Sequence, residues 1–308
     1  MIRLSFIVPF YNVEPYIEEC IRSLYAQDIP QEEYEVICVD DCSPDGSRAI
    51  VERLQREYTT LQLLSCPFNM KQGGARNLGM KEAKGEYVWF VDSDDCIMPN
   101  VLTKILNDAE RNSLQILQFA YLNGEKMMSC SDKEIQSGEE YLFNNTEKIS
   151  WVYKVMGPWR QIYLRFFLNS HDFTYIENVQ YEDTDYVLKA FVAADRVAAI
   201  DEAVYIYRKN DSSTTHDSKV DPQKLAWQIN QYARCADLIN SISLAKGRTA
   251  VENMIYNSLF SLRADLKRFS GKQKYVYRKN LCSKVYKLRP IISWRTWLAI
   301  RYGITWFI

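Results

Sequence analysis

The sequence is poor in the side chains that build structural zinc sites. Its 308 residues include two histidines, His171 and His216, and its eight cysteines form no Cys-x-x-Cys pair. Because a structural zinc site needs closely spaced nitrogen and sulfur ligands, we expect none here. Residues 2–10 have the pattern of a strand, so no secretory leader is expected. Scattered cysteines without a leader favour reduced thiols in a cytosolic protein.

Long hydrophobic runs and one common glycine motif are also absent. No stretch of about 18 or more uncharged apolar residues occurs, so the sequence predicts no typical transmembrane helix. The first predicted strand leads into Pro9-Phe10-Tyr11-Asn12 rather than into Gly-x-Gly-x-x-Gly. A nicotinamide-dependent oxidoreductase would need that glycine motif to bind its dinucleotide, so this class is excluded.

What the sequence does contain is an alternation of apolar strands and amphipathic helices. With 47% hydrophobic residues it can bury a large core, as one large domain or two smaller ones. Alternation of this kind is typical of a parallel sheet covered by helices on both faces, and it predicts an α/β fold of nucleotide-binding type. We expect strands at 4–8, 36–39, 61–64, 87–91 and 115–121, and helices at 15–26, 47–58, 74–83 and 99–111.

A cluster of acids follows the apolar strand predicted at 87–91. Asp92, Ser93, Asp94 and Asp95 come directly after it, at the carboxyl end where open α/β sheets place their ligands. Three neighbouring carboxylates repel one another unless a cation lies among them, and carboxylate oxygens are preferred ligands of Mg²⁺ and Mn²⁺. The cluster therefore predicts a divalent metal that holds a phosphate-bearing substrate. An acidic turn without a metal is the alternative.

Polar loops follow the other predicted strands as well. Tyr11 follows the first strand and is able to stack on a flat base. The turn at 40–47 follows the second strand, and one of its acids is suited to accept the N–H of a pyrimidine. Paired glycines and Arg76 lie within 69–77, where backbone and guanidinium are suited to approach a phosphate. Each loop alone is typical of a well-capped turn, but together they indicate one ligand-binding crevice.

These motifs resemble, in order and spacing, those of the family 2 glycosyltransferases with the GT-A fold. The resemblance extends over about the first 215 residues. Cys42 and Pro44 depart from it, since Gly and Thr are frequent there in the family. The segments that carry it are Val8 to Asn12, Val39 to Ser47, Gly74 to Gly79, Gly85 to Asp95, Gly157 to Leu168, Tyr181 to Tyr186, Tyr205 to Arg208 and Ser212 to Thr214.

The resemblance implies the GT-A nucleotide-diphospho-sugar transferase fold, an α/β fold with a Rossmann-like mixed sheet flanked by helices and a helical C-terminal region. It implies an inverting glycosyltransferase that uses a UDP-sugar, with Asp41 reading the uracil. The metal, Mn²⁺ or Mg²⁺, would be held by Asp94 and by His216, although an exposed loop histidine is an equal alternative for the latter. The resemblance implies that the nucleotide sugar is bound by Pro9, Tyr11, Asp41, Arg76, Asp92 and Ser93.

The acceptor hydroxyl needs a base, and the resemblance gives that role to Asp183, with Glu182 as its neighbour and fallback. The alternative is that both acids complement the dipole at the start of the following helix. Transfer from a GDP- or dTDP-sugar, and a catalytically inactive sugar-nucleotide binding protein, remain open as other functions.

The end of the chain differs from the rest in charge. Residues 263–301 hold 12 Lys or Arg and one acid, which leaves 26 basic and 38 acidic residues elsewhere. Basic residues and tryptophans in the tail suit a helix on an anionic membrane surface, or one packed on the catalytic domain. We expect a catalytic domain at 1–218, with a nucleotide-sugar half at 1–120 and an acceptor half at 121–218, and a helical region at 219–308.

The expected partners and location follow from the same resemblance. The partners are a nucleotide-sugar donor, a saccharide or lipid-linked acceptor of surface-polysaccharide synthesis, and the membrane surface, but no nucleic acid. The expected location is cytoplasmic, on the inner face of the plasma membrane if the tail binds lipid.

Overall fold

The computed structural model describes residues 1–128, 140–143 (backbone only) and 157–210, together with residues 227, 230, 231, 234, 235 and 238. The chain divides into two compact units. The first comprises Met1–Asn144, Gly157–Val179 and Ala194–His216, and the second comprises Asn145–Met156, Gln180–Ala193 and Asp217–Ile308. Within the described residues, no helix has the length and apolarity needed to cross a bilayer.

The first unit alternates strands and helices in the order expected from the sequence. The strands are β1 (Leu4–Phe10), β2 (Tyr34–Asp40), β3 (Leu61–Ser65), β4 (Tyr87–Phe90), β5 (Cys96–Ile97), β6 (Ile116–Asn123), β7 (Lys126–Met128), β8 (Glu140–Phe143), β9 (Gln161–Leu164) and β10 (Val197–Tyr207). The helices are α1 (Ile17–Tyr25), α2 (Ser47–Leu54), α3 (Lys71–Glu82), α4 (Leu102–Arg111) and α6 (Arg165–Ser170), with short 3₁₀ turns η1 (Gln31–Glu33) and η3 (Pro158–Arg160). In the second unit, α7 spans Asp183–Ala193.

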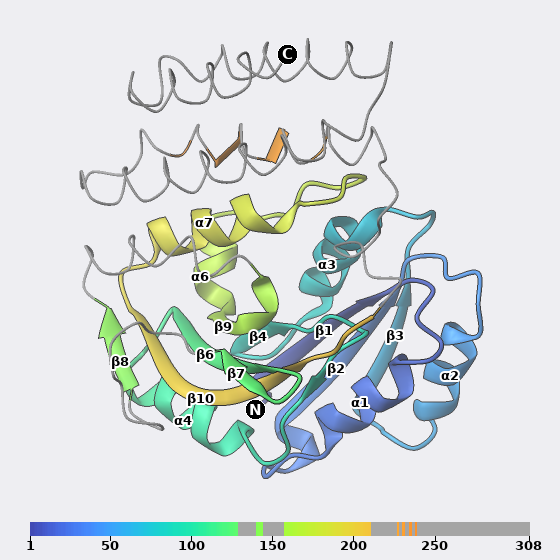
Figure 1. The fold of residues 1–308 in the computed structure, drawn as a ribbon, viewed down its shortest axis with the longest axis horizontal. Coiled ribbons are helices and arrows are strands. Elements are labelled where there is room, and N and C mark those ends of the chain that lie inside the picture. Colours follow the sequence, from blue (N-terminus) through green and yellow to red (C-terminus); the bar gives the residue numbers. More distant parts are fainter. Residues whose placement is uncertain are drawn as a thin grey trace. The chain divides into compact units, whose positions relative to one another are not determined.

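The strands form one mixed sheet. Their order is β3-β2-β1-β4-β9-β6-β10-β5, with β7 on β6 and β8 on β10. The four strands from β3 to β4 are parallel, whereas β9 runs antiparallel to both β4 and β6. Figure 1 shows this curved sheet running from β3 at the right through β1 and β4 to β10 and β8 at the left. The predicted parallel sheet is therefore confirmed for its first four strands, and the complete sheet is mixed.

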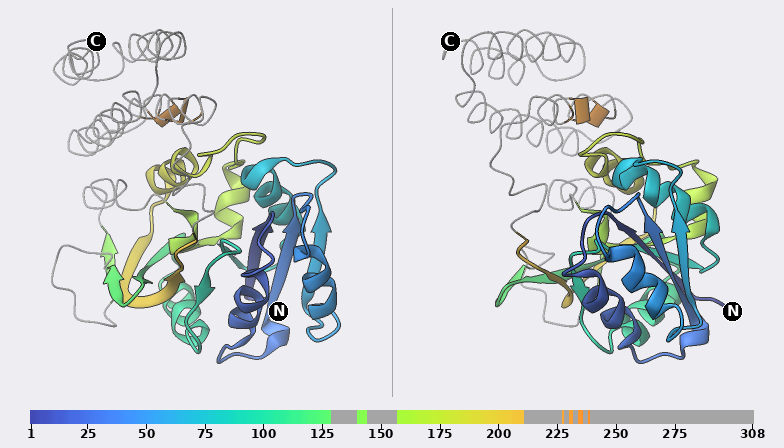
Figure 2. Two further views of the ribbon diagram at one scale, coloured as in Figure 1. Left: turned by 45° about the vertical axis from the view of Figure 1, so that its right-hand side comes forward. Right: turned by 90° about the vertical axis from the view of Figure 1, so that its right-hand side faces the viewer.

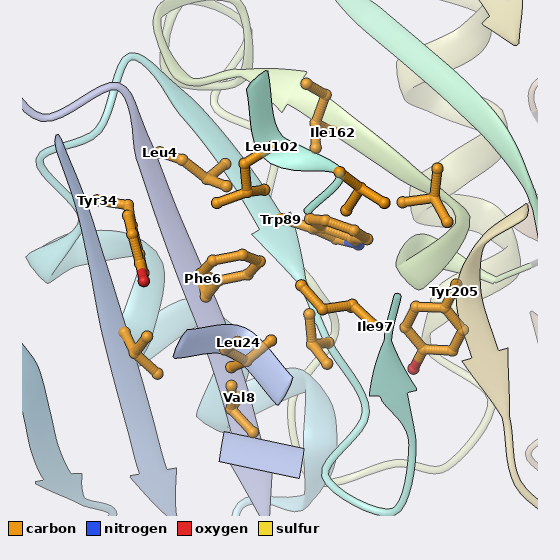
Figure 3. Close-up of a cluster of buried hydrophobic side chains, with 14 of the residues drawn as sticks. Leu4, Phe6, Val8, Leu24, Tyr34, Trp89, Ile97, Leu102, Ile162 and Tyr205 are labelled. Carbon is orange, nitrogen blue, oxygen red and sulfur yellow. The ribbon is translucent and has the colours of Figure 1, made fainter. Parts of the chain in front are cut away.

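Helices cover both faces of the sheet because alternate strand residues point to opposite sides. Leu4, Phe6 and Val8 of β1 join one apolar cluster with side chains of α1, α2 and α4. The ribbon views of Figure 2 show these helices beside the sheet. Figure 3 shows Trp89 of β4 in this cluster with Phe6 on one side and Tyr205 on the other. All of these side chains are fully buried or nearly so. The cluster is the core of the first unit, and it fixes the strands whose ends carry the polar loops.

Helix α3 lies on the opposite face and approaches the sheet closely at Gly79. A Cβ atom at this position would lie 2.6 Å from Cγ2 of Ile7 and 3.2 Å from Cγ2 of Val39. Both distances are below normal van der Waals contact, so only glycine fits without a shift of the helix. The close approach holds α3, and with it Arg76, against the ends of β1 and β2.

The predicted elements are confirmed, with shifts of a few residues at their ends. The largest shift is at α2, which ends at Leu54 rather than at residue 58, and α3 begins at Lys71 rather than near residue 74. The paired glycines Gly73 and Gly74 are therefore buried in the first turns of the helix and do not form a loop ahead of it. Lys71 enters the helix with a φ of 63°, a turn that the hydrophobic pattern does not indicate.

Some expectations lie outside the described residues. They concern His216 and the basic tail from residue 284 onward, and they stay predictions from the sequence. The domain boundary expected at residue 218 also stays a prediction.

We predict that Gly79→Ala destabilises the protein by about 1–3 kcal/mol, because the added methyl group overpacks the contact with Ile7 and Val39. Urea unfolding monitored by circular dichroism measures this change. Lys81→Ala, at an exposed position of the same helix, is the control and is expected to change stability by less than about 0.5 kcal/mol. Equal stability of Gly79→Ala and wild type would contradict the close packing.

Candidate functional site

The polar loops of the first unit meet because β1, β2 and β4 are parallel neighbours. Phe10 pairs with Asp40, and Ile7 pairs with Phe90, so the three carboxyl ends lie at the same edge of the sheet. Tyr11 follows β1 directly, and its side chain is 47% exposed. Pro9, in contrast, is a buried residue within β1. This edge is where an open α/β sheet binds its ligands.

Asp41 follows β2 and is held by the start of α3. Its carboxylate accepts the backbone N–H of Met70 at 2.6 Å and a hydrogen bond from the Cys66 thiol. Burial raises the pKa of Asp41 above its usual value, and these hydrogen bonds oppose that rise. The buried carboxylate is thus fixed in one orientation at the edge of the sheet.

Cys42, next to Asp41, has a φ of 64°, in the left-handed region where a non-glycine side chain is unfavourable. This conformation explains why glycine suits the position better.

Arg76 and Asp92 form a partly buried ion pair. Arg76 is 2% exposed, and its Nη2 donates to Oδ1 of Asp92 at 2.9 Å. The guanidinium also lies over the ring of Tyr175, 5.2 Å from its centroid. Arg76 thus orients Asp92 and places a fixed positive charge near the acidic loop.

Asp95 anchors the acidic loop to the segment after β10. Its carboxylate accepts the Tyr205 hydroxyl at 2.7 Å and the backbone N–H of Arg208 at 2.8 Å. The Arg208 side chain donates to the carbonyl oxygens of Asp94 and Asp95 and pairs with Glu19. Burial, together with the charges of Asp92 and Asp94, raises the pKa of Asp95 to about 8. Burial thus favours the protonated, uncharged form of Asp95 in this loop.

Asp94 is half-buried, and the amide of Asn210 donates to its Oδ2 at 3.0 Å. Among the described residues, no group of three or more Asp, Glu, His or Cys side chains is arranged to hold a metal by itself. Mg²⁺ and Mn²⁺ in nucleotide sites are commonly bound by one or two carboxylates, with substrate phosphates and water completing the shell. Asp94 and Asp92 are both half-buried acids of the same loop, and they fit such a shared site.

The acids expected to act on the acceptor lie in the second unit. Asp183 is the first residue of α7, and Glu182, which precedes it, is 2% exposed. Asp183 accepts the backbone N–H of Thr184 at 2.9 Å and the Gln231 amide at 3.1 Å, both at Oδ1. The helix start expected from the sequence is confirmed, and the carboxylate of Asp183 is held by a residue from further along the chain.

From the sequence, Asp95 is expected only as one acid of the cluster, and Tyr205, Arg208 and Asn210 are not expected at the site. The antiparallel pairing of β5 with β10 brings them there. Ile206 pairs with Cys96, and continuing that register places Arg208 opposite Asp94. A pairing register between segments more than 100 residues apart is not visible in a single sequence. The one hint in the sequence was Arg208, a cationic residue directly after the strand that ends at Tyr207.

We predict that Asp95 contributes stability to the metal-free protein that is lost as the pH rises from about 4 to about 8, because unfolded Asp95 ionises near pH 4 while the folded group keeps its proton until about 8. Asp95→Asn lacks this titration. Its free energy of unfolding relative to wild type should therefore rise over this range, by at most about 1.4 kcal/mol per pH unit. Urea titrations at several pH values with a chelator measure the difference, and a pH-independent difference would contradict the prediction.

The sequence was compared with protein families and with curated proteins. Residues 5–157 match the model of glycosyl transferase family 2. The uncharacterized glycosyltransferase EpsJ of Bacillus subtilis is 32% identical over 69% of this chain and 62% of that protein. The poly(ribitol-phosphate) beta-N-acetylglucosaminyltransferase TarS of Staphylococcus aureus is 32% identical over 72% of this chain and 38% of that protein. The chain thus spans less than two thirds of the length of these relatives.

Solved structures share the fold. The crystal structure of S. aureus TarS 1–349 in complex with UDP-GlcNAc has a TM-score of 0.77 and 24% identity, and the match covers 98% of this chain and 87% of that one. The mannosyltransferase PcManGT from Pyrobaculum calidifontis, in complex with GDP-Man and Mn²⁺, has a TM-score of 0.57 and 18% identity, with 98% and 84% covered. The expected GT-A fold is confirmed. Together with the family match and the 32% identity to glycosyltransferases, these findings show that the chain belongs to glycosyl transferase family 2.

Proposed function

We propose that this protein transfers a sugar from a UDP-sugar to a saccharide or lipid-linked saccharide acceptor, with inversion, in cell-surface polysaccharide synthesis. The observation that carries the proposal is the grouping of Asp41, the Arg76–Asp92 pair and Asp94 at one sheet edge of a family 2 domain. The names and ligands of the relatives support it, since TarS is a beta-N-acetylglucosaminyltransferase and its structure holds UDP-GlcNAc.

The first unit supplies the groups for the donor. The exposed ring of Tyr11 is suited to stack on the base, and the fixed carboxylate of Asp41 is suited to accept the N–H of uracil. Asp92 is oriented by Arg76, and Asp94 by Asn210, so both carboxylates are preorganised. The Mn²⁺ of the PcManGT complex supports a divalent metal here. Held by Asp94 and Asp92, it would stabilise negative charge on the departing diphosphate.

The second unit supplies the candidate base. The acceptor hydroxyl oxygen forms a bond to the anomeric carbon as the bond from that carbon to the diphosphate oxygen breaks, and UDP leaves with that electron pair. Asp183 takes the hydroxyl proton in this step, with Glu182 as its neighbour. Attack on the face opposite to the leaving UDP inverts the anomeric configuration.

Isothermal titration of UDP-, GDP- and dTDP-sugars, each with and without Mn²⁺, tests the donor class. We expect one UDP-sugar to bind with metal dependence and Asp94→Ala to lose that dependence, because the variant lacks the carboxylate that shares the metal with the diphosphate. Asp195→Asn, an exposed carboxylate outside the acidic loop, is the control and should bind as wild type does. Binding of a GDP- or dTDP-sugar alone would reassign the donor, and binding of none would refute the proposal.

We predict that Asp183→Asn lowers kcat by about 10²–10⁴-fold while the affinity for the UDP-sugar stays within about twofold, since the variant loses a base and keeps the donor site. Release of UDP in the presence of acceptor measures kcat, and titration measures the affinity. Full activity of the variant would remove Asp183 from the mechanism. Glu182→Gln, assayed in parallel, then tests the neighbouring acid.

A further inference from the structure

Two side chains from far along the chain hold the start of α7. Gln231 is 2% exposed, and its amide nitrogen donates to Oδ1 of Asp183 at 3.1 Å. The same oxygen accepts the backbone N–H of Thr184 at 2.9 Å. Two donors on one carboxylate oxygen restrict rotation of the carboxyl group, so Asp183 is held in one orientation.

Arg234 fixes the backbone on both sides of Asp183. Its Nε and Nη2 reach the two carboxylate oxygens of Asp185, each at 3.0 Å, and Nη2 also donates to the carbonyl oxygen of Tyr181 at 3.3 Å. Asp185 is 2% exposed, so this bidentate pair is shielded from water on the carboxylate side. Tyr181 has a φ of 61°, an unfavourable conformation for a tyrosine that needs support from its surroundings.

The two donors belong to one helical face. Arg234 and the fully buried Cys235 follow Gln231 by three and four residues, and all three are in helical conformation. A single face therefore contacts both ends of the segment 181–185. Lys189 also reaches Asp185, at 3.6 Å, but its side chain is 36% exposed, and exposed pairs contribute little.

We propose that Gln231 and Arg234, two residues in helical conformation, are positioning residues for Asp183. The inference rests on the proposed function, because it takes Asp183 as the base for the acceptor hydroxyl. Gln231 orients the carboxylate and favours its ionised form, and Arg234 holds Asp185 and the carbonyl group of Tyr181, on either side of Asp183. The family model ends at residue 157, so neither residue is part of the matched domain.

The test measures kcat against pH for Gln231→Met, which removes the donor at similar volume, and for Gln231→Glu, which places a like charge at the same distance. We expect kcat to fall about tenfold or more in both variants. The acidic limb of the pH profile should move up by about one pH unit in Gln231→Met and by more than that in Gln231→Glu. The KM for the UDP-sugar should stay unchanged. A purely structural role would lower the amount of active protein and leave the pH profile in place.

Arg234→Lys and Lys189→Met form a matched pair at Asp185. Arg234→Lys keeps the charge and loses the bidentate fork, so kcat should fall severalfold, whereas Lys189→Met should retain wild-type kcat. Titration with the UDP-sugar shows that each variant is folded, and either Gln231 variant suffices if the other does not fold. Suppose that a folded Gln231 variant keeps the wild-type kcat and pH profile while Asp183→Asn is inactive. This result would overturn the positioning role of Gln231 and leave Asp183 as the base. An active Asp183→Asn would instead overturn the assignment of the base.

Discussion

Negative charge at the end of a buried strand is the constraint on which the candidate site depends. Asp92, Asp94 and Asp95 follow β4, whose four residues are fully or almost fully buried, so the carboxylates stand against an apolar sheet. Isolated carboxylates there would be costly, and the structure places donors around them. Arg76 pairs with Asp92, Asn210 bonds Asp94, and Tyr205 with Arg208 bonds Asp95. Burial and the neighbouring charges of Asp92 and Asp94 raise the pKa of Asp95, and a cation bound at this loop would reduce the repulsion among the carboxylates.

The donors come from separate parts of the fold, so features far from the loop determine its geometry. Arg76 reaches Asp92 because α3 approaches the sheet closely at Gly79. Arg208 reaches the loop because β10 pairs with the two-residue strand β5 that follows the acids. Close helix packing and a short antiparallel pairing thus serve the same loop. A change in either would move a charged partner away from carboxylates that need one.

The second unit shows the same principle around Asp183. An acid at the first turn of a helix is ordinarily explained by the helix dipole. Here a buried amide and a bidentate arginine from the C-terminal region add specific contacts to the segment that carries it. A helix start needs none of these contacts for its stability alone. They favour a role in which the orientation of the carboxylate matters, and they connect a region without recognisable motifs to the proposed chemistry.

The sequence by itself determined the alternation of strands and helices, and with it the sheet edge where Tyr11, Asp41, Asp92 and Asp94 meet, because local hydrophobic patterns and parallel strands fix which residues stand at strand ends. The motifs also determined the family. Only the tertiary structure decided that Arg76 pairs with Asp92, that α3 begins at Lys71, and that Tyr205, Arg208, Asn210 and Gln231 hold the acids. These contacts join residues 16 to 116 positions apart. They depend on strand register and helix packing, which no local pattern in the sequence encodes.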